Sequence, residues 1–189
     1  MRLFAAVVPP GAVLEELAAE VRLLRALPGG ERMRWTEPPG WHLTLAFYGE
    51  VPEDDVPELS DRLARAARRT EAFRLALRGG GRFGGDVLWA GAGGDTRTLK
   101  LLAGRAEAAG RRTGLDLGPH RPYRPHLSLA RNRTPHDLRP HTEALADFTG
   151  TEWTVTELAL IRSRLPHTGT PGERPHYAEV ASWPLHPSG

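Results

Sequence analysis

The chain has 189 residues, of which 40% are hydrophobic and 25% charged, and its formal net charge of +2 is typical of a globular protein with a sizeable core. It contains no cysteine, which excludes disulfides, a thiolate nucleophile and cysteine-ligated metal centres. No run reaches the roughly 18 apolar residues of a membrane span, so we expect a cytoplasmic protein that does not enter membranes.

Hydrophobic patterns in the first half of the chain predict a strand–helix–strand–helix–strand order. After the first strand, Val13, Leu17 and Val21 recur at helical spacing, and Pro28 with the two glycines that follow it ends this helix. The expected elements are strand 2–8, helix 12–26, strand 41–48, helix 54–69 and strand 72–78.

Three glycines at 79–81 predict a joint, after which the same order begins again. The expected elements are strand 87–90, helix 96–109, loop 111–122, strand 123–131, helix 135–146, strand 154–164, a hairpin over 167–175 and a last strand 177–183. An offset of 84 positions aligns the two halves, which indicates a diverged duplication. We therefore expect an α+β fold of two pseudo-symmetric lobes, approximately 1–80 and 81–189, with strand exchange between the lobes allowed. Mostly antiparallel sheets line a central groove, and helices lie outside.

A His-Leu-Thr-Leu-Ala pentad at 42–46 returns as His-Leu-Ser-Leu-Ala at 126–130. Both pentads alternate polar and apolar residues, so in a strand the histidine and the hydroxyl share one face and the leucines share the other. Residues two apart in a strand are separated by roughly 7 Å, so both polar groups can reach one small anion. If the duplicated units pack about a pseudo-two-fold axis, the two polar faces meet across the groove.

The four polar residues of the pentads suit cleavage of a phosphodiester without a metal ion. Cleavage requires one group that activates the nucleophile and another that protonates the leaving oxygen, and His42 and His126 can each take either role near neutral pH. The hydroxyls of Thr44 and Ser128 can donate to the non-bridging phosphate oxygens. The residues alone do not decide which histidine is the acid.

Basic residues are concentrated between Arg97 and Arg139, where ten arginines or lysines stand against three acids. Such a block favours attraction of an anionic substrate such as RNA. The alternative is codon usage, because arginine outnumbers lysine 24 to 1 in the whole chain.

The sequence resembles the 2H phosphoesterase superfamily and, within it, the bacterial and archaeal RNA 2′,3′-cyclic phosphodiesterases, also called 2′-5′ RNA ligases. The resemblance runs nearly from end to end. It is carried by Met1–Phe4, Arg34-Trp35, the stretch from His42 to Phe47 with Gly49–Val51, Arg121–Arg131 and Ser163–Leu165.

The resemblance implies a bilobal α+β fold, no required metal and a product with a 2′-phosphate end. It also implies that His42 protonates the leaving 3′ oxygen and that His126 activates water. Arg131 is a further substrate-binding candidate because similar proteins carry arginine there. Strand parity turns Arg131 away from His126 unless the strand bends or ends first, and Arg124 has the better parity, so both arginines stay candidates for substrate binding.

The remaining candidates give weaker signals. Trp35, Tyr48 and Phe83 can stack a base, although packing in the core or at the rim is the favoured reading for each. We interpret most of the other histidines as exposed. These histidines are His120, His136, His141, His167, His176 and His186. His136 and His141 are five apart, which differs from the i, i+4 ligand spacing of a helix, and no carboxylate cluster joins them, so we expect no metal site. The glycine clusters lack the ending of a nucleotide-binding loop, so no cofactor is expected.

The leading hypothesis is hydrolysis of RNA 2′,3′-cyclic phosphate ends to 2′-phosphomonoesters by two-histidine acid–base catalysis. Ligation of RNA ends as the reverse reaction is compatible with the same residues. Two alternatives remain open: a phosphodiesterase for another cyclic or linear phosphodiester, and an RNA-end-binding module without turnover. RNA is the expected partner, and no obligate protein partner is inferred.

Overall fold

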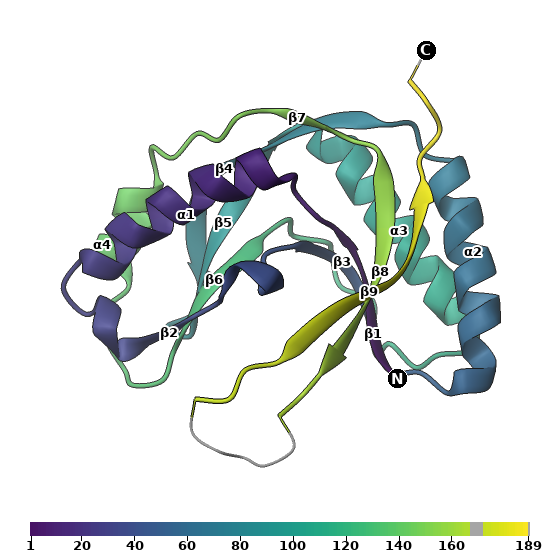
Figure 1. The fold of residues 1–189 in the computed structure, drawn as a ribbon, viewed down its shortest axis with the longest axis horizontal. Helices are drawn as coiled ribbons and strands as arrows, with labels where there is room; N and C mark the ends of the chain where they lie inside the picture. Colours follow the sequence, from purple (N-terminus) through teal and green to yellow (C-terminus); the bar gives the residue numbers. More distant parts are fainter. Residues whose placement is uncertain (167–171, 189) are drawn as a thin grey trace.

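The computed structural model describes residues 1–166 and 172–188. Helices and strands are interspersed along this part of the chain (Figure 1). In order they are β1 (Arg2–Val7), α1 (Gly11–Ala26), η1 (Gly30–Arg32), β2 (Met33–Trp35), η2 (Pro38–Gly40), β3 (Leu43–Glu50), η3 (Glu53–Asp55), α2 (Val56–Arg68), β4 (Phe73–Phe83), β5 (Val87–Gly94), α3 (Thr96–Arg112), β6 (Leu127–Asn132), α4 (Arg139–Leu145), β7 (Trp153–Val155), β8 (Glu157–Arg164) and β9 (His176–Pro184). None of the described helices combines the length and the apolarity needed to cross a membrane.

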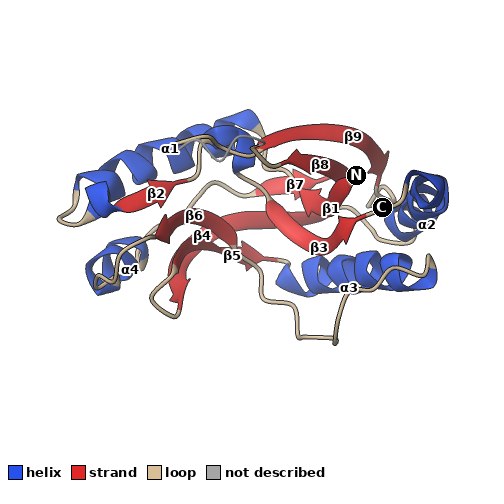
Figure 2. Ribbon diagram, turned by 90° about the horizontal axis from the view of Figure 1, so that it is seen from below, coloured by secondary structure: helices blue, strands red, loops and turns tan. Residues whose placement is uncertain are grey.

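The strands form two antiparallel sheets with helices outside (Figures 1 and 2). One sheet has the order β3-β1-β8-β9 and the other the order β2-β6-β5-β4-β7. Helices α2 and α3 pack on the first sheet through β9 and β3, and α4 packs on the second through β4 and β5. The predicted α+β class is confirmed.

Each sheet takes strands from both halves of the chain. The four-stranded sheet joins β1 and β3 to β8 and β9, and the five-stranded sheet joins β2 to β6. Residue 80 lies within β4, so the sheets do not follow the division into 1–80 and 81–189. The description of the fold as two pseudo-symmetric lobes stays a prediction.

The buried face of each element supplies a leucine-rich core. Leu17 of α1, Leu63 of α2, Leu99 of α3 and Leu160 of β8 are fully buried. Full burial of one such side chain contributes roughly 1.5 to 3 kcal/mol, so the helices are held on the sheets mainly by apolar packing.

The predicted joint at residues 79–81 is wrong, because β4 continues through the three glycines to Phe83. The pairing of β4 with β5 shifts register between Leu77 and Gly80, which is a β-bulge. A Cβ at Gly80 would lie 2.6 Å from the Trp89 carbonyl oxygen, and one at Gly81 would lie 2.5 Å from the Trp89 ring. The glycines therefore allow close approach within the sheet rather than separating two units.

Several predicted boundaries also differ from the structure. The loop around Trp35 contains the short strand β2, which pairs with β6. The predicted strand 154–164 is divided at Thr156 into β7 and β8, which belong to different sheets. The second pentad strand begins at Leu127 rather than at residue 123, and the predicted helix 135–146 covers only Arg139–Leu145. Residues 167–171 of the predicted hairpin, including His167, lie outside the described residues.

One of the histidines expected at the surface is in the interior. His141 of α4 is fully buried beside His136, with the two ring centroids 5.9 Å apart, and its ring also lies 6.2 Å from that of Trp35. His120, His176 and His186 are exposed as expected.

Candidate active site

The two pentads begin strands of different sheets: β3 is an edge strand of the four-stranded sheet, and β6 lies between β2 and β5 in the five-stranded sheet. His42 immediately precedes β3 and His126 immediately precedes β6, so each histidine stands at the entrance of its strand. The leucines of both pentads are buried, whereas Thr44 and Ser128 are only partly buried. Each pentad therefore presents its polar side chains away from the core, as the alternation predicts.

Both pentad strands contain a bulge at the same position. In the β1–β3 pair, Ala5 faces Ala46 and the next pair joins Ala6 to Thr44, so Leu45 is the extra residue. In the β5–β6 pair, Leu88 faces Ala130 and the next pair joins Trp89 to Ser128, so the extra residue is the corresponding leucine of the second pentad. A bulge reverses the side-chain parity of the residues beyond it.

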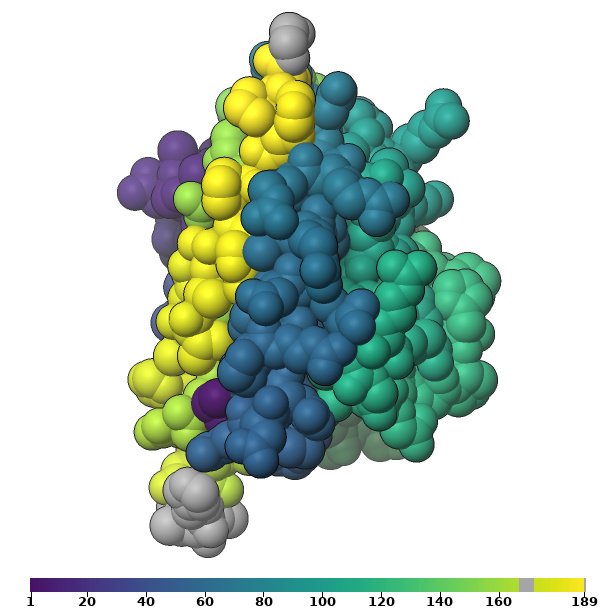
Figure 3. All heavy atoms as spheres, turned by 90° about the vertical axis from the view of Figure 1, so that its right-hand side faces the viewer, coloured from purple at the N-terminus to yellow at the C-terminus, as the bar shows by residue number. Residues whose placement is uncertain are grey.

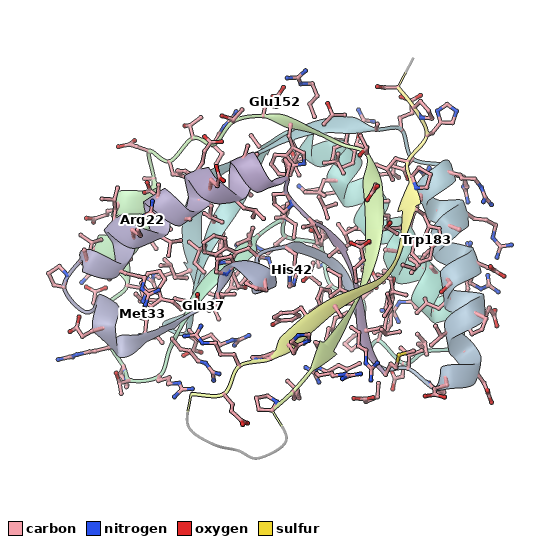
Figure 4. The ribbon with its side chains drawn as sticks, in the orientation of Figure 1. Arg22, Met33, Glu37, His42, Glu152 and Trp183 are labelled. Carbon is pink, nitrogen blue, oxygen red and sulfur yellow. The ribbon has the colours of Figure 1, made fainter. Side chains whose placement is uncertain are left out.

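A cavity of about 380 Å³ brings the pentad residues together. His42 and Thr44 line it from one sheet, and His126 and Ser128 line it from the other. Figure 4 labels His42 near the centre of the molecule. The four polar residues predicted from the sequence thus share one hollow.

The structure distinguishes the two candidate arginines. Arg131 lines the cavity, contrary to its predicted parity, because the bulge in β6 turns it to the same side as Ser128. Arg124 is exposed, does not line the cavity, and places its guanidinium carbon 5.3 Å from the Phe83 ring centroid. Of these two candidates, Arg131 is the one positioned to attract an anion within the cavity.

His42 is held among aromatic rings. The Phe4 ring stacks on it at a centroid distance of 4.6 Å, and the Tyr177 ring meets it edge-on at 5.4 Å. Burial lowers the pKa of His42 from 6.5 to about 4, because the charged imidazolium loses its hydration there. The free protein therefore carries His42 in its neutral form at neutral pH.

His126 has a fixed hydrogen bond as well as aromatic neighbours. Its Nδ1 lies 2.7 Å from the carbonyl oxygen of Arg124. Because a carbonyl oxygen only accepts, this contact assigns the proton to Nδ1 and leaves Nε2 free to accept one. Phe83 and Trp89 meet the ring edge-on at 4.8 and 6.1 Å.

The sequence analysis did not identify most of the other residues that line the cavity. Arg2, Phe4 and Ser163 belong to segments that carried the resemblance, but no role was assigned to them. Nothing in the sequence signals Tyr177, which reaches the cavity from β9. The further lining residues are Thr36, Gly40, Phe47, Leu165 and Pro175.

The three aromatic candidates for base stacking lie in different surroundings. Trp35 and Tyr48 are buried, and their polar atoms donate to the carbonyl oxygens of Gly30 and Ala106. Both therefore act as core residues. Phe83 lies against His126 and is only partly buried.

Comparison with known proteins agrees with this arrangement. Residues 10–166 match the model of the 2′-5′ RNA ligase superfamily. An RNA 2′,3′-cyclic phosphodiesterase from Thermus thermophilus is 35% identical over 176 residues, which cover 89% of this chain and 85% of that protein. A protein of the same name from Geobacillus stearothermophilus is 29% identical over 159 residues, which cover 80% of this chain and only 47% of that protein.

A solved structure supports the same assignment. The apo structure of Escherichia coli LigT superimposes with a TM-score of 0.76 and 26% identity, covering 98% of this chain and 97% of that one. The similarity therefore extends over the sheets and helices as well as over the pentads. The chain belongs to the 2′-5′ RNA ligase superfamily.

Proposed function

We propose that this protein hydrolyses RNA 2′,3′-cyclic phosphate ends to 2′-phosphomonoesters. The observation that carries the proposal is the single cavity lined by both pentad histidines and both pentad hydroxyls. Relatives that cover most of the chain carry the name RNA 2′,3′-cyclic phosphodiesterase, which supports the substrate class.

The cyclic phosphate binds between the two pentads. The Thr44 and Ser128 hydroxyls donate to its non-bridging oxygens, and the Arg131 guanidinium balances its negative charge. Hydrogen bonds to a charged group contribute about 1.5 to 3 kcal/mol each, and those that strengthen as negative charge builds on the non-bridging oxygens accelerate the reaction.

His126 acts as the base. Its Nδ1–H donates to the Arg124 carbonyl oxygen, so Nε2 is available to take a proton from water. The water oxygen then forms a bond to phosphorus, and the imidazolium that results keeps its hydrogen bond to the carbonyl. This tautomer is the physical support for the role that the family resemblance implies.

His42 acts as the acid. The phosphorus–O3′ bond breaks as His42 transfers its proton to O3′, which leaves the phosphate on the 2′ oxygen. Burial keeps His42 neutral in the free protein, so it must gain this proton when the substrate binds. An anionic phosphate in the cavity favours the imidazolium and raises the His42 pKa.

With another nucleophile, the same proposed step gives ligation. When the 5′-hydroxyl of a second RNA takes the place of water, attack on the cyclic phosphate gives a 2′-5′ linkage and a free 3′-hydroxyl. No group beyond the four pentad residues and Arg131 is needed for either outcome.

The test is incubation with an oligonucleotide that ends in a 2′,3′-cyclic phosphate, with and without EDTA, followed by identification of the new end. We expect a 2′-phosphate at an unchanged rate in EDTA. A 3′-phosphate would reverse the roles of the histidines, and strong inhibition by EDTA would contradict the metal-free mechanism. Binding without any product would support the alternative of an RNA-end-binding module.

A further inference from the structure

A second hollow lies between α2 and α3 and shares no lining residue with the cavity of the pentads. Its volume of about 550 Å³ exceeds that of the cavity. Figure 3 shows these two helices side by side on one face of the molecule. Because they cover the outer face of the four-stranded sheet, the hollow opens on the side away from the pentads. We call it the α2–α3 groove.

Twelve residues line the α2–α3 groove. Seven of the twelve are basic, and none of the twelve is acidic. The cations are Arg62, Arg65, Arg68, Arg69, Lys100, Arg105 and Arg112. The whole chain has a net charge of only +2, so this concentration is local. Like charges at such a density repel one another, and a bound anion relieves that repulsion.

Only two of the seven cationic side chains are engaged by the protein within the described residues. Arg62 pairs with Glu58 at 2.7 Å, and Arg105 donates to the Arg69 carbonyl oxygen and the Thr70 hydroxyl. The other five have neither an ion pair nor a side-chain hydrogen bond in residues 1–166 and 172–188. Arg65, Arg68, Arg69, Lys100 and Arg112 are all exposed.

The floor of the groove is apolar and open. Leu101 is 49% exposed, and Ala108 lies about two turns further along α3. Gly104 lies between them, and a Cβ placed on it would meet no atom within 4 Å. An apolar floor between cationic rims fits a chain that has flat apolar faces and regularly spaced anions.

We propose that the α2–α3 groove binds the phosphate backbone of an RNA strand, with riboses or bases against Leu101 and Gly104. The inference rests on the proposed function, because RNA is the polyanion that this activity brings to the protein. The groove and the cavity lie on opposite faces of one sheet, so a nucleoside cyclic phosphate in the cavity does not reach the groove. Only a longer RNA contacts both.

The first experiment compares two triple variants with the same change in charge. Arg65→Glu, Arg68→Glu and Arg112→Glu remove the groove cations, and the control carries Arg22→Glu, Arg32→Glu and Arg133→Glu, which are exposed and line neither site. The probe is a single-stranded RNA of about 20 nucleotides with a 3′-hydroxyl end, and its affinity is measured over a range of salt concentrations. We expect the affinity of the groove variant for RNA to fall at least about tenfold. The slope of log affinity against log salt concentration should become shallower by about 2.

The second experiment keeps the charge and fills the groove. Gly104→Trp projects a ring into open space and is expected to weaken RNA binding several-fold, whereas Gly104→Ala leaves it unchanged. This pair keeps the proposal testable if the triple variant fails to fold. Equal affinity losses in the groove variant and its charge control, or full binding by Gly104→Trp, would overturn the proposal. Binding of polyglutamate instead of RNA would also overturn it.

Hydrolysis separates this inference from the proposed function. With a nucleoside 2′,3′-cyclic phosphate, the groove variant should keep the wild-type kcat and KM; with a long RNA bearing the same end, its KM should rise about tenfold or more. If the wild-type protein cleaves neither substrate, the proposed function fails while the binding experiments still decide the role of the groove. Equal loss on the short and the long substrate would contradict a separate RNA site.

Discussion

The two histidines come from nearly identical pentads but stand in different surroundings. His42 is stacked on Phe4 with a pKa lowered to about 4, and its ring forms no hydrogen bond within the described residues. His126 is anchored through Nδ1 to the carbonyl oxygen of Arg124. Burial of His42 favours proton release once it is charged, whereas the contact of His126 fixes its tautomer and leaves Nε2 as the acceptor atom.

Under the proposed mechanism, this difference explains how two nearly identical pentads take two roles. The pentads set the same geometry in both strands, including a bulge at the second leucine. The neighbours that distinguish the histidines come from outside the pentads: Phe4 from β1, Tyr177 from β9, and a carbonyl group two residues before His126. We infer that the two repeated strands supply the histidines and hydroxyls of the site, and that neighbours outside the repeat decide which histidine is the acid and which is the base.

Removal of either imidazole should have the largest effect. His42→Ala and His126→Ala should each lower kcat by about 10² to 10⁴-fold on a cyclic-phosphate oligonucleotide, because each histidine transfers one proton. The control is His120→Ala, which changes an exposed histidine outside the cavity. If either pentad variant keeps full activity while folded, the two-histidine mechanism is wrong.

The second prediction concerns stability and pH. The pKa of His42 is lower in the folded than in the unfolded protein, so between pH 6.5 and about 4 the unfolded chain binds a proton that the folded chain refuses. Stability should therefore fall as the pH drops through this window. One pKa unit corresponds to about 1.4 kcal/mol, so His42 lowers the free energy of unfolding by at most about 3 kcal/mol at the acid end.

Urea denaturation at several pH values checks this prediction. His42→Gln should flatten the pH dependence, because it removes the titrating group. Part of the dependence should remain, since burial also lowers the pKa of His141. If the variant and the wild type lose stability equally on acidification, His42 is not desolvated as described.

The third prediction separates the two arginines. Arg131→Ala should reduce kcat/KM about 10 to 100-fold, because Arg131 faces the anion in the cavity and a charged hydrogen bond contributes about 1.5 to 3 kcal/mol. Arg124→Ala should have little effect, since His126 uses the backbone carbonyl oxygen of that residue rather than its side chain. Steady-state kinetics on one short substrate compare the pair directly. A larger loss in Arg124→Ala than in Arg131→Ala would favour Arg124 as the anion-binding residue. It would contradict the role that the bulge in β6 gives to Arg131.

The smallest effect is expected from exchanging the hydroxyl residues. Thr44→Ser and Ser128→Thr make each pentad resemble the other and keep both hydroxyl donors in the cavity. The rate of hydrolysis should stay within about threefold of the wild type, a change in barrier well below the 1.36 kcal/mol of a tenfold effect. A large loss in either variant would indicate that the methyl group, not only the hydroxyl, positions the phosphate.

The sequence predicted the parts of the site that depend on local pattern. Alternation placed the polar members of each pentad on one face of a strand, and the repeat indicated that the two faces meet. Alternation could not reveal the bulges, because an extra residue such as Leu129 is recognised only from the partner strand. Parity in a regular strand therefore favoured Arg124, and Arg131 stayed a candidate only through the condition that the strand bends.

Other differences arose where long-range packing decides the structure. The glycines at 79–81 look like a joint, but they lie within β4 because Trp89 and α4 approach them closely. The three residues of β2 are too few to show a period, and only their pairing with β6 makes them a strand. His141 is buried by tertiary packing that its polar neighbours in the sequence do not indicate.

The most direct test of the account is a titration of both imidazoles by nuclear magnetic resonance, with and without saturating sulfate as a stand-in for the phosphate. We predict that one bound sulfate shifts the signals of His42 and His126 together and raises the pKa of His42 above its free value of about 4. If sulfate shifts only one of the two rings, or leaves the His42 pKa unchanged, the two histidines do not share one phosphate and the proposed mechanism is contradicted.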